Sequence, residues 1–268
     1  MSARGTDDVS ALPPVNDDTI RECDDRAFRA WPSEETLNLS GWIVRHAAQA
    51  GTRRINSVYP ARMSEGIDLD VLVDQVEGRY AGYGLPTQFQ ISPASSPGGL
   101  DERLKDRGYQ REAPTAVEWA RCRDVRLNPG HQQHDNVDIS ENMSDDWAVA
   151  YRYSLLSDQE LSARRAVIDR IKQPKALAKL TVNGETVSIG LGVYDTGWAG
   201  VFCMFTRPEN RRRGYAHRVL NALTQWTVSN GGESMYLLVV EDNDVARTFY
   251  RERGFSPAYG YHYRAFSD

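Results

Sequence analysis

The sequence predicts an α/β fold built on a mixed sheet, of the α+β kind, and two observations lead to this prediction. From residue 198 to the C-terminus, strand-like and helix-like runs alternate in the order β-α-β-α-β. Further upstream, Asn183-Gly184 separates two strand-like runs and is a strong signal for a hairpin, which requires antiparallel pairing. We therefore expect helices packed on a sheet that contains both parallel and antiparallel neighbours.

Length and composition limit the interpretation further. A chain of 268 residues, of which 40% are hydrophobic and 10% aromatic, is long enough for two domains of about 100–150 residues. No stretch approaches the roughly 20 apolar residues of a membrane span. Residues 1–19 read as a flexible polar tail rather than a signal peptide. We expect a cytoplasmic protein with no membrane partner.

The cysteines and the net charge argue against two further classes. Cys23, Cys122 and Cys203 are widely spaced and form no Cys-x-x-Cys pair, which argues against a disulfide framework or a zinc site and fits a reducing compartment. We accordingly expect no bound metal. The formal net charge of −5 argues against a general nucleic-acid binder.

The chain after Pro129 reads as one complete unit of helices and strands. Ser144 is placed to cap one helix, and Ser157 begins a capping box with Glu160 that opens a second helix. The expected elements are a strand at 137–139, helices from 144 and from 157, and strands at 176–182, 187–193 and 198–206.

A basic turn follows the last of these strands. Three arginines at 211–213 precede Gly214 and a run from Tyr215 in which apolar residues recur at helical spacing. The N-terminus of a helix leaves backbone N–H groups unpaired and carries partial positive charge, so a turn of this kind can bind phosphate. Taken alone, the same pattern also fits a solvated basic patch.

The remaining residues complete the alternation of helices and strands. Gly231-Gly232 ends the helix, and residues 235–240 read as a buried strand. A short helix then runs from about Asp244 to Arg253, where Gly254 closes it. A last strand covers about residues 256–265.

Two motifs make this region resemble the GNAT superfamily of N-acetyltransferases. The basic turn is similar to that family's Gln/Arg-x-x-Gly-x-Gly/Ala sequence and runs here from Arg211 to Ala216. The family's Asn-x-x-Ala-x-x-hydrophobic-Tyr-x-x-x-Gly-Phe sequence is matched by Asn243, Ala246, Phe249, Tyr250, Gly254 and Phe255. Each motif alone is moderately specific, but the two in this order, separated by a helix and a strand, are a strong signal. The order of elements over roughly residues 136–268 also resembles that of the family.

The resemblance implies that this C-terminal part of the chain binds acetyl-CoA. It assigns the pyrophosphate to the basic turn and the pantetheine arm to the end of the preceding strand, where a backbone N–H at Cys203 or Met204 would donate to the thioester oxygen. The cofactor-binding residues expected on this basis are Cys203, Met204, Phe205, Thr206, Arg211, Arg212, Arg213, Gly214, Tyr215, Ala216 and Asn243. Asn243 also stands where the N-cap of the next helix belongs, and both interpretations stay open.

Tyr250 is the catalytic residue that the resemblance implies. A phenol has an ordinary pKa of about 10, so it is protonated at neutral pH and can protonate a departing thiolate. The alternative interpretation is a tyrosine that only packs on a helix face.

No general base is evident in the sequence. Many family members carry a glutamate about a dozen residues before the glycine of the basic turn. In this sequence Phe202 and Cys203 occupy that place before Gly214, and neither is a conventional base. Glu241 and Asp242 follow the next strand but fit loop residues equally well. The amine could instead arrive neutral or lose its proton through ordered water. A covalent intermediate on Cys203 is disfavoured, because an isolated cysteine in a strand is usually a small buried hydrophobe.

Residues 20–125 show a weaker version of the same organisation. Runs at 37–44, 53–59, 87–91 and 115–119 read as strands, and runs at 67–80 and 100–107 read as helices. Arg107-Gly108-Tyr109 ends the second helix much as Arg253-Gly254-Phe255 ends the later one. We therefore expect a degenerate GNAT-like half at 20–125, a linker at 123–133, and the N-acetyltransferase domain at 136–268.

The first half lacks the residues that the chemistry needs. The segment that replaces the basic turn is residues 61–66. It has no glycine at the fourth position, and Glu65 would repel a pyrophosphate. When Gly108 is aligned with Gly254, Pro97 takes the position of Asn243, and Leu104 takes that of Tyr250. We expect this half not to bind acetyl-CoA, and to serve either as structure or as part of the acceptor cleft.

The function expected from these observations is N-acetyl transfer from acetyl-CoA to a primary amine of a small molecule or peptide, by direct transfer in a ternary complex. We expect a monomer or a homodimer. One alternative is a non-catalytic acyl-CoA-binding or scaffold protein, since the base is missing and one half is degenerate. Another is a GNAT enzyme that uses a larger acyl group, such as propionyl or succinyl. Tyr250 favours an enzyme over a scaffold.

Overall fold

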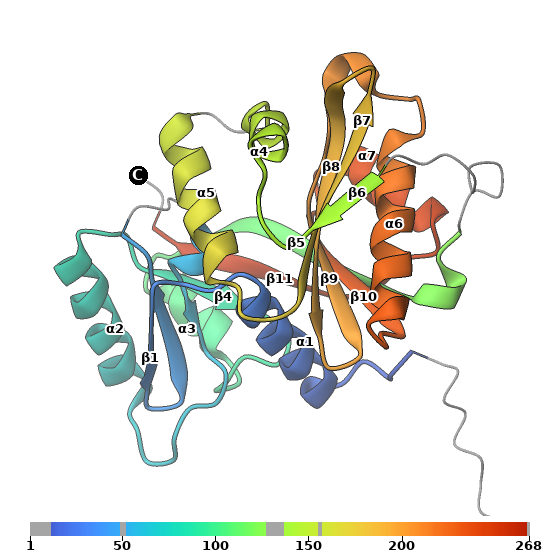
Figure 1. The fold of residues 1–268 in the computed structure, drawn as a ribbon. Helices are drawn as coiled ribbons and strands as arrows, with labels where there is room; N and C mark the ends of the chain where they lie inside the picture. The colour runs from blue at the N-terminus through green and yellow to red at the C-terminus, as the bar shows by residue number, and fades with distance from the viewer. Residues whose placement is uncertain (1–11, 49–51, 127–136, 155–156, 267–268) are drawn as a thin grey trace, which may run out of the picture.

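The computed structural model describes residues 12–48, 52–126, 137–154 and 157–266, which form one mixed sheet of 11 strands with helices on both faces (Figure 1). The strands are β1 (Glu35–Leu39), β2 (Trp42–His46), β3 (Val58–Tyr59), β4 (Gln88–Ile91), β5 (Gln110–Arg121), β6 (Val137–Ser140), β7 (Lys175–Val182), β8 (Glu185–Asp195), β9 (Trp198–Thr206), β10 (Ser234–Val240) and β11 (Ser256–Ala265). The α-helices are α1 (Asp17–Ala30), α2 (Leu69–Tyr83), α3 (Leu100–Asp106), α4 (Asp145–Arg152), α5 (Asp158–Arg170), α6 (Tyr215–Ser229) and α7 (Asp244–Glu252), and short 3-10 turns are η1 (Arg53–Ile55), η2 (Cys122–Asp124) and η4 (Pro208–Asn210). The predicted α+β fold with a mixed sheet is confirmed.

The two parts of the chain share this sheet. Its strand order is β1-β2-β3-β4-β11-β5-β10-β9-β8-β7-β6. β5, from the first part of the chain, lies between β10 and β11 and is antiparallel to both. β11, the last strand, in turn pairs with β4. A strand of the first part, β5, therefore lies between two strands of the second part, and a strand of the second part, β11, pairs with β4 of the first. The linker predicted at 123–133 lies mostly outside the described residues, and the degenerate character of residues 20–125 stays a prediction.

The helices cover the two faces of the sheet in two groups. Tyr261 and Tyr263 on β11 belong to the apolar cluster that contains the buried residues of α1, α4 and α5. The alternate residues His262 and Arg264 bind Asp101 of α3, so α3 lies on the opposite face. Over the later strands, α6 and α7 pack through a second cluster that includes Leu220 and Tyr250. A third cluster joins α2 and α3 to the strands β2, β3 and β4.

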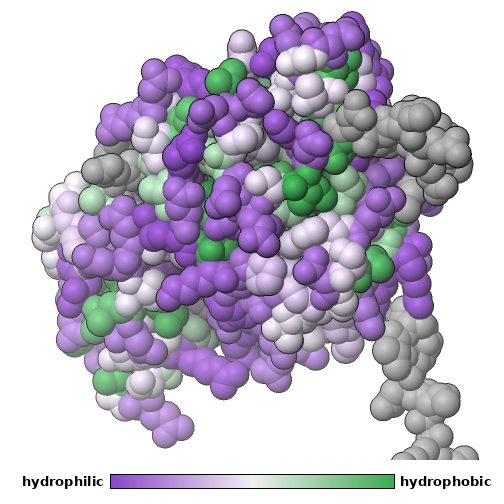
Figure 2. All heavy atoms as spheres, viewed as in Figure 1, coloured by the Kyte–Doolittle hydropathy of each residue, from purple (hydrophilic) through white to green (hydrophobic). Residues whose placement is uncertain are grey.

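The surface drawn in Figure 2 is mainly hydrophilic, with hydrophobic residues scattered rather than joined in one band. Among the helices of the described residues, none combines the length and the apolar character that crossing a membrane requires.

Two strands predicted in the first part of the chain have a different structure. The run at 37–44 is a hairpin, because Ser40 and Gly41 turn the chain at φ 50° and 88°. A Cβ atom at Gly41 would lie 1.6 Å from the carbonyl oxygen of Arg62, so this turn accepts only glycine. The run at 53–59 consists of the 3-10 turn η1 followed by the two-residue strand β3.

Helix α1 was not predicted at all. It begins after Asn16, whose side chain forms a capping box with Thr19, so the end of the tail predicted at 1–19 is helical. The side chains that it buries are mostly small or polar: Ile20, Cys23, Asp24, Ala27 and Ala30. Such residues give no clear periodicity of large apolar side chains, which explains the omission.

Candidate active site: the cleft between α6 and α7

The turn that leads into α6 leaves the start of the helix open. Gly214 is the N-cap residue at φ 78°, and Arg212 also has a positive φ of 60°. No side chain of the described chain caps α6, so its first backbone N–H groups stay available. Arg211 bends back, and its Nε donates a hydrogen bond to the carbonyl oxygen of Thr206 at 3.3 Å. This contact fixes the turn against the end of β9.

A cleft of about 890 Å³ opens at this turn and extends to α7. Its volume is within the usual range of ligand pockets, about 300–1,000 Å³. The predicted site residues that line it are Met204, Phe205, Thr206, Arg211, Arg212, Gly214, Tyr215, Ala216, Asn243 and Tyr250. Two other predicted residues do not line it: Arg213 is exposed beside the turn, and Cys203 lies deeper in β9. The fold thus brings most of the two motifs to one place.

Strand β9 bulges where it passes this cleft. Cys203 has a φ of 52°, and the pairing of β9 with β8 shifts its register at the same point. On the other side, the parallel pairing of β9 with β10 runs only as far as Val201 and Leu237. Beyond these residues the two strands separate. The edge of β9 from Phe202 to Thr206 therefore offers backbone groups with which an extended ligand can pair.

Tyr250 projects from α7 into the cleft. Its side chain is 8% exposed, and no hydrogen bond to its hydroxyl is found among the described residues. Burial raises the pKa of Tyr250 above its ordinary value, and the charge of Glu118 adds to the shift. The phenol is therefore protonated throughout the neutral range and can donate a proton.

Glu118 is a neighbour of Tyr250 that the sequence interpretation missed. It lies on β5 opposite Leu237 and is 1% exposed, and within the described part of the chain neither carboxylate oxygen has a hydrogen-bond partner that meets the usual distance. The closest charge is the guanidinium of Arg247, with Nε 3.7 Å from Oε1. Burial raises the pKa of Glu118. A glutamate inside the apolar run at 115–120 could have marked Glu118 as a functional candidate. The sequence interpretation did not predict that β5 lies beside β10, so it did not place this residue near Tyr250.

The second motif holds α7 in place. Asn243 caps the helix, since its Oδ1 accepts a hydrogen bond from the N–H of Ala246 at 3.1 Å, and it lines the cleft as well. At Gly254, where φ is 93°, a Cβ atom would lie 2.5 Å from the carbonyl oxygen of Asp124. Only glycine allows this approach, which fixes the end of α7 against the segment that follows β5.

Cys203 does not have the surroundings of a nucleophile. Its thiol donates a hydrogen bond to the hydroxyl of Tyr151 over 3.3 Å. Burial raises its pKa to about 11, so the thiolate is rare at neutral pH. The loop residues Glu241 and Asp242 do not line the cleft either.

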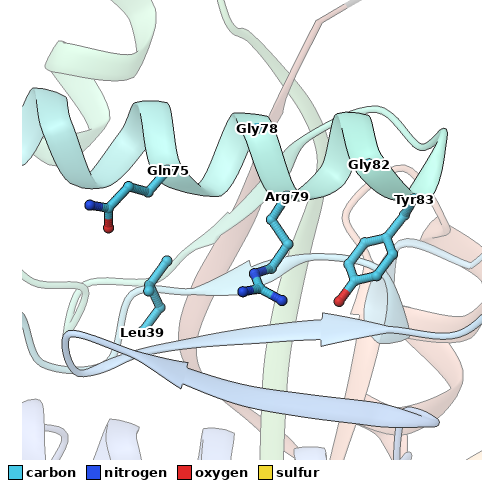
Figure 3. Close-up of a pocket in the computed structure, with 6 residues that line it drawn as sticks. All are labelled: Leu39, Gln75, Gly78, Arg79, Gly82 and Tyr83. Carbon is cyan, nitrogen blue, oxygen red and sulfur yellow. The ribbon is translucent and has the colours of Figure 1, made fainter.

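In the first half of the chain, the helix N-terminus that corresponds to the start of α6 is capped by a side chain. The N-terminus of α2 is capped by Asp68, whose carboxylate accepts a hydrogen bond from the N–H of Val71 at 3.1 Å. A separate groove runs along the side of this helix, and in Figure 3 Arg79 and Tyr83 extend from α2 towards the β1–β2 hairpin. A carboxylate at the helix N-terminus opposes phosphate binding. The described residues also contain no group of three or more potential metal ligands.

Two comparisons with known proteins cover most of the chain. A family model described as "Probable histone acetyltransferase Rv0428c C-terminal" matches residues 18–264. The chain is 28% identical over 249 residues to the "Uncharacterized N-acetyltransferase YobR" of Bacillus subtilis (strain 168), which covers 92% of this chain and 98% of that protein.

Two solved structures share the fold over most of the chain. A GCN5-related N-acetyltransferase from Kribbella flavida superposes with a TM-score of 0.64 and 12% identity, covering 91% of this chain and 94% of that one. A tandem GNAT protein from the clavulanic acid biosynthesis pathway superposes with a TM-score of 0.61 and 13% identity, covering 96% and 90%.

Proposed function

The chain belongs to the family described as probable histone acetyltransferase Rv0428c C-terminal and is a GNAT N-acetyltransferase, and from this premise we propose its reaction. The acyl donor is acetyl-CoA, and the acceptor is a primary amine of a small molecule or peptide. The acetyl group passes directly between them in a ternary complex. The observation that carries the proposal is the cleft that joins the uncapped start of α6 to Tyr250.

The geometry of that cleft supports the following mode of donor binding. The pyrophosphate accepts hydrogen bonds from the N–H groups at the start of α6, and Gly214 leaves room, since a Cβ atom there would meet nothing within 4 Å. Arg211 and Arg212 add positive charge. The pantetheine arm pairs with the free edge of β9 after the bulge, in the manner of an added strand.

The chemical step uses the bulge and Tyr250. A backbone N–H at Cys203 or Met204 donates to the thioester oxygen and stabilises the negative charge that develops there. The neutral amine attacks the carbonyl carbon, the C–S bond breaks, and the phenol of Tyr250 gives its proton to the sulfur. The new amide nitrogen loses a proton to water, and the phenolate of Tyr250 takes up a proton from water.

A thiol-release assay tests this proposal. Incubated with acetyl-CoA, the protein should liberate CoA thiol only when a suitable amine is added, and mass spectrometry should show the amine heavier by one acetyl group. Propionyl-CoA and succinyl-CoA in parallel reveal any preference for a larger acyl group. A protein that binds acetyl-CoA but releases no thiol with any amine of a broad panel would instead be a non-catalytic binder.

A further inference from the structure

The face of β9 opposite the cleft carries an unusual group of arginine and aromatic side chains. Phe202, at the bulge, belongs to the apolar cluster that contains the buried residues of α1, α4 and α5, and Cys203 packs against the same cluster. The guanidinium of Arg54 lies 5.9 Å from the ring centre of Phe202, and that of Arg164 lies 5.7 Å from the ring centre of Trp31, which stacks on Phe202 with ring centres 5.9 Å apart. A group bound near these arginines therefore lies close to the point of acyl transfer.

Arg54 comes from η1, in the first part of the chain. Its guanidinium lies 5.9 Å from the ring centre of Phe202 and 6.0 Å from that of Trp31. Its Nε is buried without a hydrogen-bond partner, and within the described ranges it forms no ion pair with a carboxylate. Burial acts to lower the pKa of Arg54, but interactions with Tyr261, which include a side-chain hydrogen bond, and with Tyr263 and Cys203 raise it overall. Arg54 therefore stays charged and, among the described residues, has no carboxylate partner, so an anion can bind beside it.

Arg164 approaches the same indole from α5. Its guanidinium lies 5.7 Å from the ring centre of Trp31, so two arginines from different parts of the chain share one aromatic side chain. Arg164 also forms an ion pair with Glu160 at 3.3 Å, one helical turn away. The two arginines and Cys203 are only partly buried, whereas Trp31, Phe202, Tyr261 and Tyr263 are almost fully buried. The arginines are therefore more exposed than the aromatic side chains near which they lie.

We propose that Arg54 and Arg164 bind an anionic oxygen group of the acceptor, and that the acceptor is a small amine carrying a carboxylate or a phosphate. This inference rests on the proposed acetyl transfer. A guanidinium binds both kinds of oxyanion through paired, charge-assisted hydrogen bonds. With the anion held at Arg54, the amine of the same molecule can reach the thioester at the bulge. Two arginines here would repel a lysine-rich peptide.

Matched pairs of acceptors test the inference. β-Alanine is compared with β-alaninamide, and phosphoethanolamine with ethanolamine, in the presence of acetyl-CoA. Hydrogen bonds to charged groups contribute about 1.5–3 kcal/mol, so the anionic member of one pair should have a KM lower by roughly 10- to 100-fold. Which pair shows the preference distinguishes carboxylate from phosphate.

The arginine variants assign that preference to its residues. Arg54→Gln should raise KM for the anionic acceptor at least tenfold, while KM for its neutral partner and for acetyl-CoA stay the same. Arg54→Lys keeps the charge and should retain part of the preference, which separates loss of binding from loss of folding. Arg165→Gln, next to Arg164 on α5 but paired with the exposed Asp145, is the control and should change nothing.

The outcomes separate this inference from the proposed function. Equal use of anionic and neutral amines, better use of a lysine-rich peptide, or an unchanged preference in Arg54→Gln would overturn the inference and leave acetyl transfer standing. If no amine releases thiol, the proposed function fails. Calorimetric titration of the anionic amines into the CoA-bound protein and into its Arg54→Gln variant then still decides the inference, because only the unaltered protein should bind them.

Discussion

Tyr250→Phe is expected to lower kcat by about 10²- to 10⁴-fold, the usual contribution of general acid catalysis, while the dissociation constant for acetyl-CoA changes little. The phenol is buried at the cleft, its pKa is raised, and among the described residues no hydrogen bond engages its hydroxyl. Phenylalanine keeps the ring and its packing against Phe255, whose centroid is 5.6 Å away. The variant therefore removes the proton donor and little else. Steady-state kinetics and a CoA titration measure the two quantities separately.

Tyr109→Phe provides a matched control. Tyr109 is also buried, but it donates a hydrogen bond to Glu77 at 2.8 Å, in the first part of the chain. Losing that bond should reduce stability by about 1 kcal/mol and leave turnover of the folded enzyme unchanged. If Tyr250→Phe behaves like this control, the thiolate leaves without the help of the phenol and the assignment of the acid is wrong.

Gly214→Asp should weaken binding of CoA by more than about 100-fold. A carboxylate about 5 Å from a phosphate charge costs about 3 kcal/mol at an effective dielectric constant of about 20, and here it replaces a site that favours anions. The protein itself leaves room for the side chain, since a Cβ atom at Gly214 meets nothing within 4 Å. Isothermal titration of CoA into each protein measures the loss.

Gly214→Asn separates charge from shape. Asparagine and aspartate are similar in size and both tolerate the positive φ of 78° better than most residues, but only aspartate is charged. The asparagine variant should lose much less affinity. Equal, small losses in both variants would mean that phosphate does not lie at this turn.

Local sequence signals predicted several helix starts and turns of the fold. Ser144 and Ser157 cap α4 and α5 as expected, with side chains that accept hydrogen bonds from Trp147 and Glu160. Asn183 and Gly184, with φ 52° and 83°, turn the chain between β7 and β8. These features depend on residues a few positions apart, which is why a single sequence reveals them. The two motifs are local in the same sense, and most of their residues line one cleft.

Contacts between segments that are distant in the chain could not be predicted from the sequence. The run at 115–119 has the pattern of a strand, but nothing in it specifies that β5 inserts between β10 and β11. Glu118 therefore could not be placed beside Tyr250. The pairing of Arg54 with Arg164 across Trp31 likewise joins three elements far apart in the chain. The buried side chains of α1 are mostly small or polar, so tertiary packing rather than periodicity determines that helix.

A crystal structure with CoA tests most directly the central claim, that the cleft between α6 and α7 is the donor site. We predict one CoA per chain, with its pyrophosphate at the N–H groups of residues 214–216, its pantetheine along the edge of β9 and its sulfur beside the hydroxyl of Tyr250. CoA bound at another position, or a second CoA at the start of α2 where Asp68 occupies the helix N-terminus, would contradict the account.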